Sequence, residues 1–202
     1  MSLTLYELAP SRSARVRWTL LELDRPFESR TGIELFQGEE LRKIHPLNKF
    51  PAFVDDGRPL FESAAICNWL ADSHPEKNFI AKPGTWQRAL HDQWVCFTLT
   101  EIEAPLWSTA RNTFVLPEDQ RNASIIPQND RDASRALAVL DAALDGKSFL
   151  IDDRFSVTDI FVGYIVNWAR MAGLTADFAN LQAYNERLFA FPHCTLVRDV
   201  PQ

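Results

Sequence analysis

The stretch from residue 49 to residue 63 constrains the fold more than any other part of this chain. A short apolar run, Pro51–Val54, precedes Asp56-Gly57, and a second apolar pair, Leu60-Phe61, follows. An Asp-Gly step between two apolar runs is a strong local signal for a β-hairpin. Glu62-Ser63 then opens a helical pattern, and the first turn of a helix offers free N–H groups and partial positive charge to a carboxylate. The sequence therefore predicts a hairpin followed by a helix whose start can hold an anion.

The residues before this stretch complete an alternating series of strands and helices. Alternation predicts a strand over residues 3–6, and Val16, Leu20 and Leu23 predict a helix after the loop at 9–13. A second strand is expected over 26–30 and a short helix over 36–44. With the hairpin and its helix, this order predicts an α/β thioredoxin-like domain with a mixed sheet and helices on both faces.

The second half of the chain has a different pattern. Residues 75–84 are rich in helix breakers and form the best candidate linker. Helical periodicity follows over 86–114, with a kink expected at Pro105, then over 131–144 and 181–191. Ser156 and Asp159 form a variant capping box before the apolar run Ile160–Trp168, which predicts a buried helix. We therefore predict an N-terminal thioredoxin-like domain at 1–78 and an all-α C-terminal helical bundle domain at 85–202.

Charge and cysteine usage restrict the partners and the compartment. The formal net charge is −6, which argues against nucleic acid and against anionic membrane surfaces as partners. No apolar run approaches the ~20 residues of a membrane span, and no signal peptide is visible. The three cysteines and four histidines show no metal-ligand spacing, so no metal is expected. An odd cysteine count without a disulfide framework favours a reducing cytoplasm, and Cys67 and Cys96 are expected in the core.

The central stretch resembles the glutathione-binding half of the cytosolic glutathione S-transferases, of the bacterial type with a theta- or zeta-like serine. The segment His45-Pro46-Leu47-Asn48-Lys49-Phe50-Pro51 is similar to the family pattern Asn-Pro-x-Gly-Lys-Val-Pro, and Glu62-Ser63 to its Glu/Gln-Ser. The resemblance implies that glutathione is bound by Lys49, Phe50, Pro51, Glu62 and Ser63. It implies a cis Pro51, main-chain pairing of Phe50 with the cysteinyl part, and a γ-glutamyl end held by Glu62 and Ser63. Asn48 stands where the family has Gly, a mild departure because Asn tolerates left-handed backbone geometry.

A thiol nucleophile must be ionised, and an ordinary thiol has a pKa near 8.5. Lowering that pKa by about two units requires roughly 2.7 kcal/mol, which one donated hydroxyl hydrogen bond and a helix N-terminus can supply. Ser11, Ser13 and Tyr6 are the hydroxyl candidates between the first strand and the first helix. Residues 11–17 look like the zeta segment Ser-Cys-Ser-Trp-Arg-Val-Arg, which favours Ser11 as the catalytic residue and leaves Ser13 and Tyr6 as alternatives. Arg12 replaces the zeta Cys, which weakens the case for isomerase activity.

The resemblance implies an enzyme that conjugates glutathione, as co-substrate, to a hydrophobic electrophile. It also implies a homodimer and an electrophile pocket in the helical domain, for which Phe97, Trp107, Arg111 and Phe114 are the candidate wall. Two alternatives stay open. One is glutathione-dependent isomerisation of the zeta type, and the other is a non-catalytic binding protein like the bacterial stringent starvation proteins.

Overall fold

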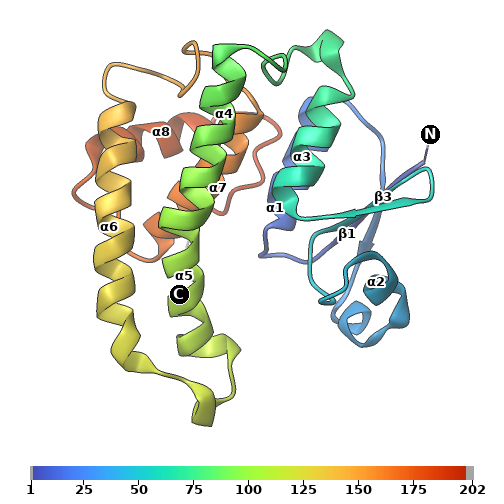
Figure 1. Cartoon of the computed structure of the whole chain (residues 1–202), viewed down its shortest axis with the longest axis horizontal. Helices are drawn as coiled ribbons and strands as arrows, with labels where there is room; N and C mark the ends of the chain where they lie inside the picture. The colour runs from blue at the N-terminus through green and yellow to red at the C-terminus, as the bar shows by residue number, and fades with distance from the viewer. Residues whose placement is uncertain (1, 199–202) are drawn as a thin grey trace. The chain divides into compact units, whose positions relative to one another are not determined.

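The structure, a computed structural model, describes residues 2–198 and consists of two compact units. Of these residues, unit 1 comprises 2–83 together with 192–196, and unit 2 comprises 84–191 together with 197–198. Figure 1 shows the chain coloured from its N-terminus to its C-terminus, with a sheet and helices in unit 1 and helices in unit 2.

Unit 1 contains a four-stranded mixed sheet, as the sequence predicts. Its strands are β1 (Leu3–Glu7), β2 (Glu28–Thr31), β3 (Ala52–Asp55) and β4 (Arg58–Phe61). Their order is β2-β1-β3-β4, in which β1 runs parallel to β2 and antiparallel to β3, and β3 pairs antiparallel with β4. The predicted hairpin is confirmed. Asp56 and Gly57 both have positive φ, 46° and 79°, as a two-residue turn that matches the strand twist requires.

Helices cover both faces of this sheet. They are α1 (Ser13–Glu22), α2 (Glu39–Ile44) and α3 (Ser63–Asp72), and α1 and α3 lie side by side (Figure 1). Successive strand residues point to opposite faces. Tyr6 and Ala52 pack with Leu41 of α2 and with Phe50 on one face, so their strand neighbours turn to the other face.

The helix predicted over 36–44 is divided in the structure. A 3-10 helix at Ile33–Gln37 precedes α2, and Gly38 between them has extended backbone (φ −81°, ψ 150°). Another short 3-10 helix, Pro75–Lys77, occupies the predicted linker.

Unit 2 is built from helices, again as predicted. The α-helices are α4 (Trp86–Phe97), α5 (Ala104–Ala110), α6 (Ile126–Ala143), α7 (Val157–Met171) and α8 (Ala179–Phe189). Two π-helical segments, Thr98–Glu103 and Arg111–Val115, extend α4 and α5, and two 3-10 helices, Glu118–Gln120 and Ala123–Ile125, precede α6.

Two prolines explain the differences from the predicted helix limits. Pro105 lies in the first turn of α5, directly after the first π-helical segment, where a proline without an N–H interrupts the regular ladder. Pro127 lies in the first turn of α6, which begins at Ile126 rather than at the predicted Arg131. Proline suits the first turn of a helix, where its missing donor would have no partner.

The core of unit 2 is centred on α7, as the apolar run predicts. Ile160, Phe161 and Ile165 are at most 1% exposed, and the predicted capping box of Ser156 and Asp159 is present. The predicted stripe of α6 is likewise buried at Ala133, Leu137, Leu140 and Leu144.

Asp159 is fully buried at the start of α7. Its carboxylate accepts hydrogen bonds from the Ser156 N–H at 2.9 Å, the Leu150 N–H at 3.3 Å and the Tyr184 hydroxyl at 2.8 Å. Burial nevertheless raises the pKa of Asp159 to about 6, because desolvation penalises the charged form more than these bonds favour it.

The cysteine prediction is half right. Cys67 is 1% exposed, and burial raises the pKa of its thiol to about 11. Cys96 is exposed, contrary to the prediction, because the buried line of this helix follows His91, Val95 and Thr98 instead. Among the described helices, none is long and apolar enough to cross a membrane.

Candidate functional site

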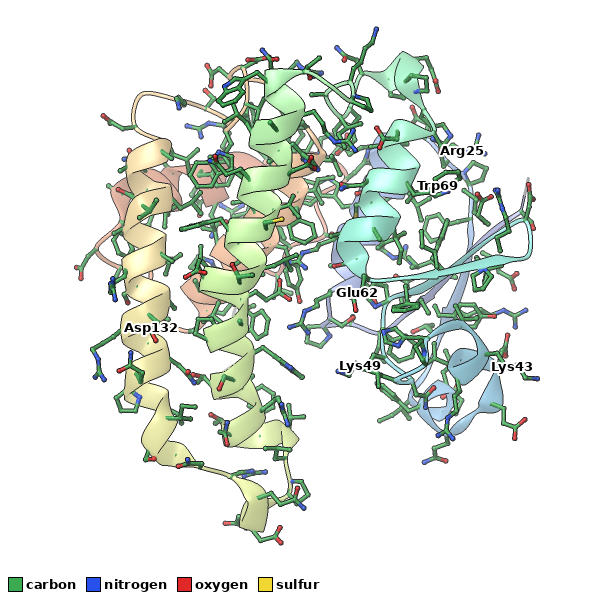
Figure 2. The ribbon with its side chains drawn as sticks, viewed as in Figure 1. Arg25, Lys43, Lys49, Glu62, Trp69 and Asp132 are labelled. Carbon is green, nitrogen blue, oxygen red and sulfur yellow. The ribbon has the colours of Figure 1, made fainter. Side chains whose placement is uncertain are left out.

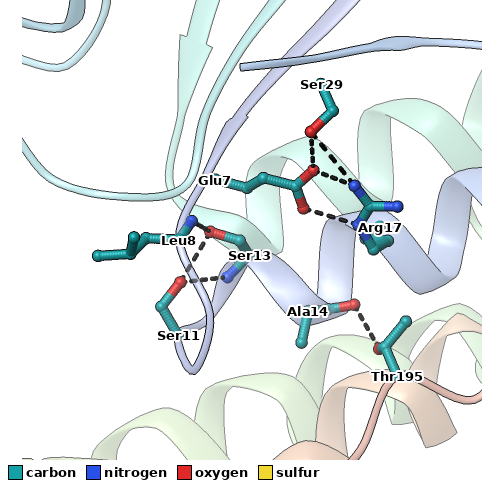
Figure 3. Close-up of polar contacts among 8 residues, drawn as sticks. All are labelled: Glu7, Leu8, Ser11, Ser13, Ala14, Arg17, Ser29 and Thr195. Atoms are coloured by element: carbon teal, nitrogen blue, oxygen red, sulfur yellow. Dashed lines mark hydrogen bonds and ion pairs between the residues drawn. The ribbon is translucent and has the colours of Figure 1, made fainter. Parts of the chain in front are cut away.

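The junction between β1 and α1 brings two of the predicted hydroxyls together. Strand β1 ends at Glu7, α1 begins at Ser13, and the connecting loop includes a cis Ala9–Pro10 bond. The oxygens of Ser11 and Ser13 lie 2.8 Å apart, and the Ser13 N–H donates to Ser11 Oγ at 3.2 Å (Figure 3). Ser13 is 2% exposed, whereas Ser11 is partly exposed. Of this pair, Ser11 is therefore the one within reach of a bound molecule.

The third candidate hydroxyl, Tyr6, is already engaged. It donates to Glu40 Oε1 at 2.5 Å, and its ring packs in the cluster with Leu41 and Phe50. Burial, with the hydrogen bond to Glu40 as the next cause, raises the pKa of Tyr6 to about 12. The proton of Tyr6 is thus held within the protein.

A polar cluster that the sequence did not reveal braces the same junction. Arg17 Nε donates to Glu7 Oε2 at 2.8 Å, Arg17 Nη2 donates to Glu7 Oε1, and Ser29 Oγ donates to Glu7 Oε1 at 2.5 Å (Figure 3). The hydrogen bond to Glu7 raises the pKa of Arg17. These contacts tie β1, α1 and β2 together. A strand-end Glu and a helix Arg ten residues later carry no local signal of such a pair.

The segment from residue 45 to 51 has the backbone geometry that the resemblance implies. The Phe50–Pro51 bond is cis, and Asn48 has φ 53°, within the left-handed region that Asn tolerates. The Asn48 side-chain amide donates to the Phe36 carbonyl, and the Phe36 and Phe50 rings meet edge-on with centroids 4.7 Å apart. Lys49, between Asn48 and Phe50 in the sequence, is exposed (Figure 2).

His45 anchors the start of this segment. It is 4% exposed, and its Nδ1 accepts a hydrogen bond from the Leu47 N–H at 3.2 Å. Burial lowers the pKa of His45. A neutral ring with an accepting Nδ1 suits a structural role in this turn.

Glu62 and Ser63 lie at the start of α3, directly after β4. Glu62 is exposed and has φ 72° and ψ 116°, a conformation uncommon for residues other than Gly. Such backbone strain persists where the surrounding structure enforces it, and it is concentrated at functional sites. Figure 2 shows Glu62 at the end of the helix where the N–H groups are free.

Ser63 has a cationic neighbour that the sequence did not predict. Ser63 is 5% exposed, and its Oγ accepts a hydrogen bond from Arg15 Nη1 at 3.1 Å. Arg15 is itself 1% exposed. Arg15 therefore places a guanidinium directly against the Ser63 hydroxyl at the start of α3. Nothing local in the sequence marks Arg15 for this place, since it is one of two arginines in α1.

Unit 2 contains a groove of about 600 Å³ along α4, α5 and α6. Phe97 of the predicted pocket wall lines it, together with Glu101, Asp132 and Arg135, but Trp107, Arg111 and Phe114 are not among its lining residues. Within residues 2–198, no group of three or more metal-ligating side chains gathers.

Two family models match the chain. The model of the glutathione S-transferase N-terminal domain matches residues 5–78, and the model of the C-terminal domain matches residues 90–192. Together they span most of the 202 residues. With its thioredoxin-like sheet and helical second unit, the chain belongs to the glutathione S-transferase family.

Individual proteins are similar to this chain in sequence or in fold. Glutathione S-transferase GST-4.5 of Xanthomonas campestris is 25% identical over 181 residues, 87% of this chain and 85% of that protein. A glutathione transferase of Pseudomonas putida, solved with glutathione disulfide bound, superposes with a TM-score of 0.81 at 21% identity, covering 96% of this chain and 89% of that one. Elongation factor 1-gamma of Danio rerio is 33% identical over 125 residues, which are 61% of this chain but 26% of that protein.

Proposed function

We propose that this protein conjugates the thiolate of glutathione to a hydrophobic electrophilic small molecule. The observation that carries the proposal is a partly exposed hydroxyl, Ser11, held in the loop just before the N-terminal end of α1. A hydroxyl in this place can donate to a sulfur anion, and the adjacent helix start adds partial positive charge. Membership of the glutathione S-transferase family supports glutathione as the thiol.

Glu62 and Ser63 are proposed to hold the γ-glutamyl end of glutathione. That end carries an ammonium and a carboxylate. The Glu62 carboxylate matches the ammonium, and the Ser63 hydroxyl, backed by Arg15 and the free N–H groups of α3, matches the carboxylate.

The remaining contacts are proposed for the segment before β3. The backbone N–H and C=O of Phe50, the residue before the cis bond to Pro51, are proposed to pair with the cysteinyl part. Lys49, exposed beside them, offers its ammonium to the glycyl carboxylate.

Ser11 is favoured over Ser13 and Tyr6 as the residue that activates the thiol, because of its exposure and its hydrogen bonds. Ser13 is 2% exposed, so it presents almost no surface to a ligand. Tyr6 donates to Glu40 and has a pKa raised to about 12, so using it would require breaking that bond. Ser11 has neither restriction.

The organisation of the chain follows from the same proposal. Residues 1–78 form the glutathione-binding domain, and residues 85–202 form the helical domain that supplies the electrophile pocket. We propose a homodimer, as is typical of the family, in the cytoplasm, where the three free cysteines stay reduced. Sedimentation that shows only monomers at micromolar concentration would contradict the dimer.

A non-catalytic role is the second candidate, favoured by one observation. The similarity to elongation factor 1-gamma shows that this sequence pattern also occurs in a relative named for another process. A protein of that kind would have no need of an activating hydroxyl.

The test combines binding and catalysis. The purified chain is passed over immobilised glutathione and then assayed for conjugation of glutathione to an activated aryl chloride. We expect retention and turnover in the wild type, about tenfold or greater loss of rate in Ser11→Ala, and no loss in Ser2→Ala, an exposed serine of the same unit. Retention without turnover on any electrophile would favour the non-catalytic role.

A further inference from the structure

We propose that Ser13 is a positioning residue that turns the Ser11 hydroxyl proton outward, toward the sulfur of the bound thiol. The inference rests on the proposed function, because it concerns how Ser11 performs that role. The inference goes beyond the proposed function because it assigns a task to Ser13, a side chain that is buried.

The two serines and the end of β1 form a short chain of hydrogen bonds. The Leu8 N–H donates to Ser13 Oγ at 3.4 Å, the two serine oxygens are 2.8 Å apart, and the Ser13 N–H donates to Ser11 Oγ at 3.2 Å (Figure 3). Either hydroxyl can be the donor across the 2.8 Å contact by distance alone.

Burial decides which hydroxyl donates. Each serine hydroxyl has one proton and two acceptor lone pairs. Ser13 is 2% exposed, and a buried donor left without an acceptor is costly. Its other contact, the Leu8 N–H, is a donor, so among the described residues Ser11 Oγ is the acceptor available to the Ser13 proton.

The direction of this bond fixes the direction of the next one. Ser11 Oγ then accepts from both the N–H and the O–H of Ser13, which fills its two lone pairs. Its own proton is left to point away from Ser13, on the partly exposed side of the residue. Two donors on the same oxygen also polarise the Ser11 O–H bond, which makes it a stronger donor to an anion.

Further hydrogen bonds support the residues of this chain. Leu8 directly follows Glu7, which Arg17 and Ser29 hold to α1 and β2. On the other side of the junction, the Ala14 carbonyl accepts a hydrogen bond from Thr195 Oγ1 at 2.8 Å, within the same unit (Figure 3). These contacts hold the neighbours of Leu8 and Ser13, the two residues that precede Ser11 in the hydrogen-bond chain.

A double-mutant cycle on the thiol pKa of bound glutathione tests the inference. The titration follows the near-ultraviolet absorbance of the thiolate in the wild type, Ser11→Ala, Ser13→Ala and the double variant. We expect Ser11→Ala to raise the thiol pKa by about one to two units, and Ser13→Ala to raise it by about half a unit to one unit. In the Ser11→Ala background, Ser13→Ala should change nothing further, because its effect passes through Ser11.

Ser13→Thr is the matched control, since it keeps the hydroxyl at the same place and should restore the wild-type pKa. If Ser13→Ala does not fold, Ser13→Cys replaces it, because a thiol donates weakly. The absorbance of the added thiol is subtracted with a titration of the same variant without glutathione.

The outcomes separate the inference from the function on which it rests. If Ser13→Ala leaves the pKa unchanged while Ser11→Ala raises it, or if Ser13→Ala has the same effect in both backgrounds, the positioning role of Ser13 is wrong and Ser11 stands. If Ser11→Ala leaves the pKa unchanged, the assignment of Ser11 fails, and the role of Ser13 fails with it.

Discussion

Replacing Ser63 by alanine removes one hydroxyl from the proposed γ-glutamyl site and leaves the backbone of α3 unchanged. Ser63 Oγ accepts from Arg15 at 3.1 Å and is 5% exposed, so its own proton is available to a ligand carboxylate in a poorly solvated place. Losing a hydrogen bond to a charged group there costs about 1–3 kcal/mol. The dissociation constant for glutathione should therefore rise about 5- to 150-fold.

Isothermal calorimetry with glutathione measures this change directly. The substitution also removes the contact with Arg15, so urea unfolding of the free protein should accompany it, with an expected loss of about 1 kcal/mol. Ser63→Thr, which keeps the oxygen, is the matched control and should retain most of the affinity. An affinity in Ser63→Ala within twofold of the wild type would remove Ser63 from the binding site.

Three further predictions follow from pKa values and burial. The pKa of Asp159 is raised to about 6 from an ordinary 3.8, so the folded state holds the proton more tightly than the unfolded chain. The resulting contribution to the free energy of unfolding is present below pH ~4 and is lost as the pH rises through about 6. Urea unfolding should thus show the wild type losing up to about 3 kcal/mol relative to Asp159→Asn over that range, and parallel curves would contradict this. Tyr6→Phe should lower the unfolding free energy by about 0.5–1.5 kcal/mol, through loss of the bond to Glu40, yet leave the pKa of bound thiol unchanged. A thiol reagent should modify exposed Cys96 in the folded protein but reach buried Cys67 only after denaturation, which mass spectrometry of the labelled peptides can check.

Local patterns predicted much of this fold because each depends on neighbouring residues. Three features were predicted from residues within a few positions of one another. They are the Asp56-Gly57 turn, the capping box of Ser156 and Asp159, and the apolar run of α7. The π-helical segments beside α5 were missed because helical periodicity does not distinguish hydrogen bonds five residues apart from those four apart.

In the candidate site, too, features set by neighbouring residues were predicted, and contacts between residues far apart in the sequence were not. The resemblance predicted the cis bond between Phe50 and Pro51, and the structure has it. The positive φ of Glu62 was not predicted, because no local pattern marks it. Arg15 beside Ser63 joins residues 48 positions apart, so only the folded sheet and helices bring them together. The same holds for the brace of Glu7, Arg17 and Ser29, since a charged residue in a strand is equally compatible with solvent exposure.

The pKa of the glutathione thiol in the complex tests the central claim most directly. Difference absorbance between bound and free glutathione is titrated for the wild type and for Ser11→Ala. The account predicts a bound thiol about two units more acidic than the ordinary pKa of about 8.5, with about one to two of those units lost in Ser11→Ala. A bound thiol with the ordinary pKa in the wild type, or the same lowered pKa in both proteins, would contradict it.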